Sequence, residues 1–206
     1  MTETKIKERP IIFSAESVRA ILAGAKTQTR RVINPQPGTT YCTKCKKDYC
    51  DCTCEFESDD HANKCTKTAI LGNIKPPYRV GERLWVREAW CDTGDAPGNI
   101  NYKASATDAD LVWIKENKWQ WLSPLFMPRK HSRITLEIVD VRCEQLQDIT
   151  RNDLIAEAHG FPGYDIPPEN HWGLYPEAWD KLNAKRGFPW ASSPWVWVIE
   201  FRRVEQ

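Results

Sequence analysis

The chain has 206 residues, of which 41 % are hydrophobic, and its formal net charge is +1. The length fits one large domain, or one domain with a substantial insert, and the apolar content is sufficient for a sizeable core. The near-neutral charge excludes bulk, nonspecific attraction to nucleic acid, so any basic site must be local. The sequence starts with no apolar signal-peptide pattern and contains no stretch that approaches a membrane span, so we expect a cytoplasmic protein without membrane contact.

The first predicted helix follows a short strand over residues 10–13. Ser14 is placed as its N-cap, and Glu16 in the first turn favours the positive end of the helix dipole. Phe13 and Val18 have the spacing of a hydrophobic staple. Gly24 is the expected left-handed stop of this helix.

The segment after Gly24 is too polar for a core and is crowded with reactive groups, namely Lys26, Thr27, Thr29 and Arg30. In an extended chain, Lys26 would point away from Thr27 and Thr29 unless the backbone bulges. A basic, solvated helix end explains the cations equally well, because Lys and Arg favour that position.

Residues 38–75 have few aliphatic side chains and cannot build a hydrophobic core. They contain six cysteines, and the first two have the Cys-x-x-Cys spacing of a zinc knuckle. Zinc prefers four tetrahedral ligands and can supply the folding energy that such a segment lacks. We expect a structural zinc and no organic cofactor, and the alternative is a flexible insert with free thiols. The predicted ligands are four of Cys42, Cys45, Cys50, Cys52, Cys54 and Cys65.

The middle of the chain is predicted to form strands. Residues 83–89 alternate as a strand that carries Trp85 and two charged residues, Arg87 and Glu88. Charges within a strand mark either an exposed face or the wall of a polar cleft. Residues 101–106 and 111–122 are interpreted as a tryptophan-rich hairpin or meander. The alternation of the strand over residues 132–143 slips at Val139, which predicts a β-bulge.

The last third of the chain is predicted as two helices and a strand. Thr150 and Asp153 form a capping box for the first of these helices, and Glu157 lies at the edge of its buried stripe. That carboxylate is either solvated or faces a cleft. A second helix is expected from Pro176 to about residue 186, with Leu182 inward. Residues 194–201 are apolar on both faces and predict a central strand.

Gly24, Lys26 and Arg30 resemble the G-x-K-x-x-x-R signature of ASCH domains, a branch of the PUA-like superfamily. Residues 79–88, 127–138 and 146–157 resemble further segments of that family, and the similarity is greatest to its phage and prophage members. It covers roughly residues 8–35 and 76–204. The resemblance implies an α+β fold: a curved mixed β-sheet or pseudo-barrel with flanking helices. Residues 1–206 would form a single domain, with 38–75 as a Cys-rich insert.

The resemblance also implies a reaction. In the N4-acetylcytidine amidohydrolase branch, Lys26, Thr29 and Glu157 fall on the positions of a proposed catalytic Lys, Thr and Glu. Thr29 would be the nucleophile and Lys26 the base, while Glu157 would hold or transfer the proton. Neighbouring residues would bind the substrate: Thr27, Arg30, Trp85, Arg87, Glu88 and Trp90.

The chain is longer than a minimal ASCH amidohydrolase, which leaves two other functions open. It could be a noncatalytic module that binds RNA or a modified base, or a metal-independent ribonuclease. The expected partner is a nucleoside or a single-stranded nucleic acid, with RNA favoured, in the cytoplasm of a phage host or other bacterium. The oligomeric state does not follow from the sequence.

Overall fold

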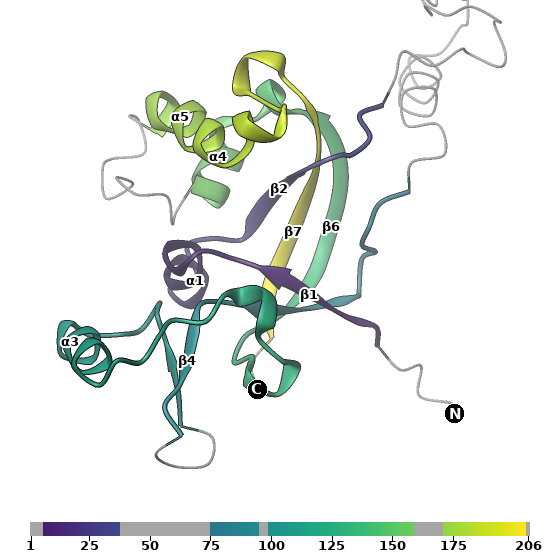
Figure 1. The fold of residues 1–206 in the computed structure, drawn as a ribbon. Coiled ribbons are helices and arrows are strands. Elements are labelled where there is room, and N and C mark those ends of the chain that lie inside the picture. Colours follow the sequence, from purple (N-terminus) through teal and green to yellow (C-terminus); the bar gives the residue numbers. More distant parts are fainter. Residues whose placement is uncertain (1–5, 38–74, 95–98, 159–170, 205–206) are drawn as a thin grey trace, which may run out of the picture.

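The computed structural model describes residues 6–37, 75–94, 99–158 and 171–204 (Figure 1). These residues form an α+β fold around a five-stranded mixed sheet in the order β1-β3-β6-β7-β2. β1 and β3 are parallel, and the other neighbours are antiparallel. A separate hairpin joins β4 and β5. The strands are β1 (Glu8–Ile12), β2 (Gln28–Val32), β3 (Arg83–Arg87), β4 (Trp90–Asp92), β5 (Ile100–Tyr102), β6 (Thr135–Gln145) and β7 (Trp195–Val204).

Four α-helices surround the sheet in the described part of the chain: α1 (Ala15–Leu22), α3 (Asp108–Glu116), α4 (Arg151–Ala158) and α5 (His171–Asn183). Short 3-10 turns span Pro124–Phe126, Arg129–His131, Leu146–Asp148, Ala184–Arg186 and Trp190–Ser192. None of the helices seen in these ranges has the length and apolar character needed to cross a membrane.

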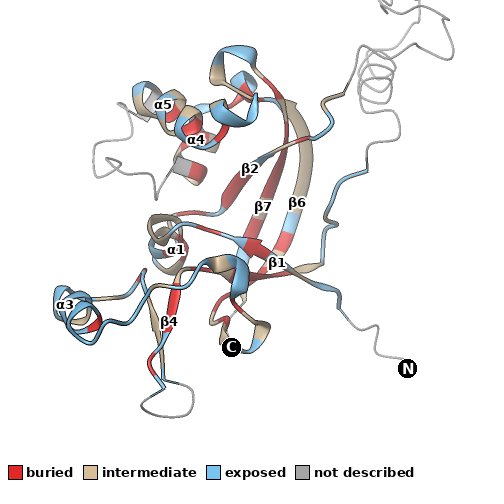
Figure 2. Cartoon of the chain, in the orientation of Figure 1, coloured by how far each residue is buried: buried red, intermediate tan, exposed pale blue. Residues whose placement is uncertain are grey.

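The sheet has a hydrophobic core on each face, and β7 contributes to both. Trp197 and Ile199 pack with the buried side of α1, whereas Val196 and Val198 pack with α4 and α5. Figure 2 shows the resulting run of buried residues along β7. The strand is therefore interior and apolar on both faces, as predicted. The second core comprises Leu146, Ile149, Leu154, Tyr175, Trp179, Val196 and Val198.

Several local predictions are confirmed. Ser14 caps α1 by accepting a hydrogen bond from the Ser17 amide, and Gly24 has a left-handed φ of 73°. Thr150 and Asp153 exchange the two hydrogen bonds of a capping box. The register of β6 against β7 shifts between Ile138 and Asp140, where the bulge was expected.

Three expectations about the fold are wrong or incomplete. The stretch expected as a second strand of a meander contains helix α3, because Thr107 and Asp110 form a capping box that starts a helix. α5 begins at His171, so Pro176 lies inside the helix and not in its first turn. The sheet is curved and mixed, but β1 and β2 remain separate edge strands in the described ranges, so it is not a closed barrel.

Candidate active site

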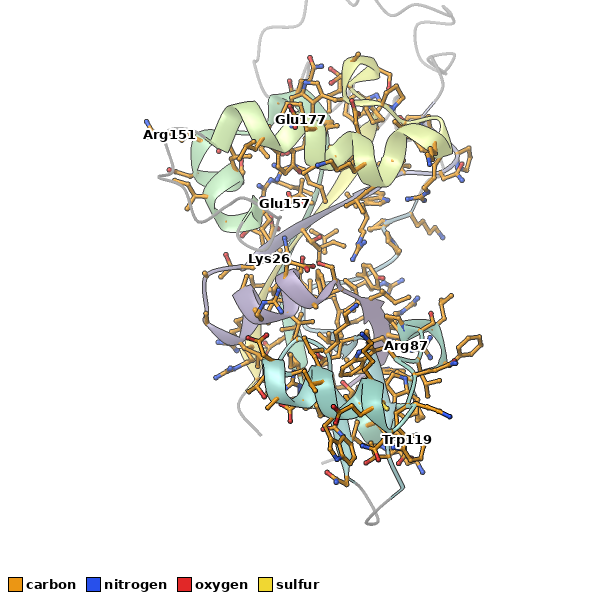
Figure 3. The ribbon with its side chains drawn as sticks, turned by 60° about the vertical axis from the view of Figure 1, so that its left-hand side comes forward. Lys26, Arg87, Trp119, Arg151, Glu157 and Glu177 are labelled. Carbon is orange, nitrogen blue, oxygen red and sulfur yellow. The ribbon has the colours of Figure 1, made fainter. Side chains whose placement is uncertain are left out.

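A hollow of about 640 Å³ opens beside β2, within the range of small-molecule pockets. Its walls come from the beginning of α1, from β2, from Glu157 of α4 and from α5. Figure 3 shows Lys26 and Glu157 next to each other, with Glu177 on α5 beyond them. Lys26, Thr29, Arg30 and Glu157 all line this hollow, which we call the pocket.

The backbone fixes Lys26 at the end of α4. The amides of Ala25 and Lys26 donate to the carbonyl of Ala20, and the amide of Thr27 donates to the carbonyl of Ala156 at 3.0 Å. The Nζ atom of Lys26 donates to the backbone carbonyl of Glu157. Carbonyls of the last helical turn lack partners within the helix, so this segment supplies donors for them. β2 begins only at Gln28, so strand alternation does not separate Lys26 from Thr29.

Lys26 is 4 % exposed, Thr29 is 5 % exposed and Glu157 is 3 % exposed. The three residues predicted to act together are therefore all almost completely buried. Burial lowers the pKa of Lys26 from 10.5 to about 8, although the negative charge of Glu157 opposes this change. The loss of hydration destabilises the ammonium ion by more than the neighbouring charge of Glu157 stabilises it. An amine with this pKa is partly neutral near physiological pH.

Thr29 lies on β2 directly opposite Ile199 of β7. Opposite residues of an antiparallel pair share a face, so Thr29 lies on the side of the sheet that α1 covers. Arg30, the next residue, faces α4 and α5. The pocket therefore lies at the edge of β2, where side chains from both faces of the sheet line it.

The guanidinium of Arg30 is completely buried and bound to carboxylates. Its Nη1 atom donates to Oε2 of Glu157 at 2.6 Å and to the Gln28 side chain at 2.8 Å, and its Nε atom donates to Glu144 at 3.0 Å. The backbone amide of Arg30 donates to Oε1 of Glu157 at 2.7 Å. Burial alone would lower the pKa of Arg30, but Glu157 and other neighbours raise it above its usual value.

These contacts extend into what we call the ion network. Arg142 donates to Asp153 at 2.6 Å and also contacts Glu200 and Glu144. Asp153 lies 3.7 Å from Arg30 as well. The network holds the carboxylate of Glu157 in place, and it engages four of the five N–H groups of Arg30 with protein side chains. Its members are Arg30, Asp140, Arg142, Glu144, Asp153, Glu157 and Glu200.

The other predicted substrate-binding residues do not line the pocket. Glu88 is buried in an ion pair with Arg133 at 2.9 Å, Arg87 lies over the ring of Trp85 at 4.6 Å, and Trp90 stacks on an imidazole. β3 is separated from β2 by two strands, and Figure 3 places Arg87 far from Lys26. Thr27 is exposed and outside the pocket. These five residues therefore lie outside the pocket, and their role in substrate binding stays a prediction.

Sequence reasoning missed the wall formed by α5. Lys181, Leu182 and Arg186 line the pocket, as does Arg31 from β2. Leu182, expected inward, is 63 % exposed. Charged residues near a helix end are usually solvated, so nothing in the local pattern showed that this end of α5 faces Lys26.

The predicted zinc ligands, from Cys42 to Cys65, lie outside the described residues. Among the residues that are described, no group of three or more His, Cys, Asp or Glu side chains is arranged to hold a metal ion. The pocket itself is lined by an amine, hydroxyl groups, carboxylates and guanidinium groups.

No protein-family model matches the chain, and no curated protein matches it. A similar solved structure is that of an ASCH domain from Lactobacillus crispatus JV V101. The likeness has a TM-score of 0.41 and 11 % sequence identity, and it covers 96 % of this chain and 79 % of that one.

Proposed function

We propose that the pocket hydrolyses an amide bond, with Lys26 as the general base and Thr29 as the nucleophile. The observation that carries this proposal is a buried lysine with a pKa of about 8 in the same hollow as a buried threonine hydroxyl. At pH 7.5 about a quarter of such an amine is neutral and able to accept a proton. A base whose pKa lies near the working pH is the most effective one.

The chemistry needs two steps. Thr29 Oγ1 attacks the acyl carbon while the neutral amine of Lys26 takes the hydroxyl proton. The ammonium that forms then protonates the departing nitrogen, which leaves as an amine, and an ester remains on Thr29. Water, activated by the same amine, cleaves the ester to a carboxylic acid and restores the hydroxyl.

Glu157 supports the base from two sides. Its backbone carbonyl accepts the hydrogen bond from Nζ of Lys26, and its negative charge favours the ammonium that forms during the reaction. Because its carboxylate is bound by Arg30 at both oxygens, we assign Glu157 to charge stabilisation and positioning rather than to carrying the proton.

The substrate we propose is an N4-acylated cytosine nucleoside. This choice comes from the sequence resemblance of Lys26, Thr29 and Glu157 to the amidohydrolase branch of ASCH domains, and the size of the pocket suits a ligand of that class. The products would be cytidine and the free acid.

The test is incubation of the full chain with N4-acetylcytidine and chromatographic measurement of the cytidine released. Lys26→Met should lower kcat/KM by at least about 100-fold, since general base catalysis contributes that much or more. Thr29→Val removes the nucleophile at nearly constant shape and should abolish release, whereas Thr29→Ser should retain part of it. The rate should rise with pH, with an inflection near pH 8, because the neutral amine is the active form.

Lys103→Met is the matched control, because Lys103 is exposed and outside the pocket. Its activity and pH profile should equal those of the unchanged protein. Absence of cytidine release from the unchanged protein, or equal release from Lys26→Met, contradicts the proposal.

A further inference from the structure

We propose that the rim of the pocket holds a subsite for a phosphate group, formed by Arg31, Lys181 and Arg186. The ligand would then be a phosphorylated nucleoside or a nucleotide within a strand rather than a free nucleoside. This inference rests on the proposed function for the identity of the nucleoside, but the subsite itself follows from the charges on the rim.

Arg31 is held at the rim by its surroundings. Its Nη2 atom donates to the carbonyl of Ile12 at 2.8 Å, and its guanidinium lies 5.4 Å from the ring centre of Phe13. These contacts occupy one edge and one face of the planar group. Arginine can bind a phosphate through the parallel donors that remain on another edge.

Arg186 approaches the same hollow from the turn after α5. Its Nη1 atom donates to the side chain of Asn183 at 3.0 Å, and Asn183 is itself buried in the pocket wall. Lys181 lies one turn earlier on α5 and also lines the pocket. Two chain segments far apart in sequence thus bring three cations to one rim.

The charge of these cations is not balanced within the described ranges. There, neither Arg31, Lys181 nor Arg186 lies within 4.0 Å of a carboxylate oxygen. Of the acidic residues in the pocket, Glu157 is paired with Arg30 and Glu16 with Arg19. The remaining acidic residue of the lining, Glu177, supplies one negative charge against the three positive charges of the rim.

Arg31 is exposed as a residue, but protein atoms crowd its guanidinium, and the resulting loss of hydration lowers its pKa. Repulsion from Arg186 adds to the effect, while Tyr78 and Glu157 oppose it. The guanidinium remains charged at neutral pH, because arginine retains its proton there. Two guanidinium groups that repel each other are stabilised when an anion binds between them.

The two sources of such a phosphate are a terminal monoester and a diester inside a strand. Calorimetric titration of the full chain should therefore compare cytidine, cytidine 5′-monophosphate and a single-stranded cytidine trinucleotide. We expect at least one phosphorylated ligand to bind about tenfold more tightly than cytidine, or better, because hydrogen bonds to charged groups contribute this much. The advantage should shrink at high salt.

Arg31→Gln and Arg186→Gln, made separately, should each reduce the advantage while the affinity for cytidine stays the same. Arg151→Gln is the matched control, since Arg151 is exposed and outside the pocket, and it should keep the advantage. Circular dichroism confirms folding of each variant.

A trinucleotide preferred over the monophosphate would assign the subsite to a strand, and the opposite order would assign it to a nucleotide. Equal affinity for all three ligands, or an advantage that survives both substitutions, overturns the subsite. If N4-acetylcytidine is hydrolysed without any phosphate preference, the proposed function stands and the subsite is wrong. A phosphate preference without hydrolysis upholds the subsite alone.

Discussion

Lys26 and Arg30 are buried cations four residues apart, and their surroundings shift their pKa values in opposite directions. Burial lowers the pKa of Lys26 to about 8, whereas the carboxylates around Arg30 raise the pKa of that residue. The guanidinium offers five donors in a plane and can satisfy several carboxylates at once, while the lysine amine in the pocket is a single point charge. The ion network therefore stabilises the fold. In the pocket, burial destabilises the charged form of Lys26, and the partly neutral amine that results is the proposed base.

The largest expected effect is on the ion network. Arg30→Met leaves the buried carboxylate of Glu157 without its ion-pair partner and the half-buried carboxylate of Glu144 with Arg142 alone, and it should lower the free energy of unfolding by about 3–5 kcal/mol. Urea unfolding at pH 7 measures this loss. Arg31→Met, at the next position on β2, removes an exposed cation and should cost less than about 1 kcal/mol. Similar losses for Arg30→Met and Arg31→Met would contradict the structural role assigned to the ion network.

An intermediate effect of opposite sign is expected at Lys26. The folded pKa of about 8 lies below the unfolded value of 10.5, so between these pH values the unfolded chain binds more protons at this group. The free energy of unfolding contributed by this group therefore rises with pH through that window. Lys26→Met should remove this rise and increase stability at pH 7 by about 1–3 kcal/mol, partly offset by the bond lost at the Glu157 carbonyl.

Urea unfolding at pH 7 and pH 9.5 tests the prediction for Lys26, with Lys103→Met as the exposed control. A Lys26→Met protein that is less stable than the unchanged protein at pH 7 would show that the contacts of the amine outweigh the cost of burying it. The contrast with Arg30 would then disappear.

The smallest effect is expected at Asp153, which joins the ion network to α4. Burial opposes ionisation of Asp153, but hydrogen bonds from Thr150 and Gln28 lower its pKa to about 2. Its stabilisation is therefore present above pH 4 and is lost as the pH falls towards 2. Asp153→Asn should cost about 1–2 kcal/mol at pH 6, and the difference should shrink at pH 3, as followed by urea unfolding. A difference that is independent of pH would contradict the assignment of this stabilisation to the ionised carboxylate.

The sequence predicted the elements whose signals are local. Ser14, Gly24 and the Thr150–Asp153 pair determine helix ends through contacts within a few residues, and the slip at Val139 marks a bulge without knowledge of the partner strand. α3 was missed because its short contiguous apolar run, from Leu111 to Ile114, also fits a strand, and the cap at Thr107 was not recognised.

The site could be predicted in part. The sequence and the family resemblance singled out Lys26, Thr29 and Glu157, which line one pocket, and their roles remain a prediction. The burial of Arg30 could not be foreseen, because it depends on carboxylates from β6 and α4 that are more than 100 residues away in sequence. The contribution of Arg31 and Arg186 depends in the same way on how α5 packs against β2.

The irregularity between Ile138 and Asp140 determines where β6 can lose a residue without reversing its faces. After it, Asp140, Arg142 and Glu144 share the face of β6 turned towards Arg30, and Val141 and Cys143 pack against the other core. Ile138 already lies opposite Phe201, and Asp140 lies opposite Glu200, so deleting Val139 would restore an unbroken register and leave every later side chain on its present face. Deleting a residue after the bulge, such as Val141, would instead turn the remaining side chains over and place Arg142 and Glu144 in the hydrophobic core, which would be far more damaging.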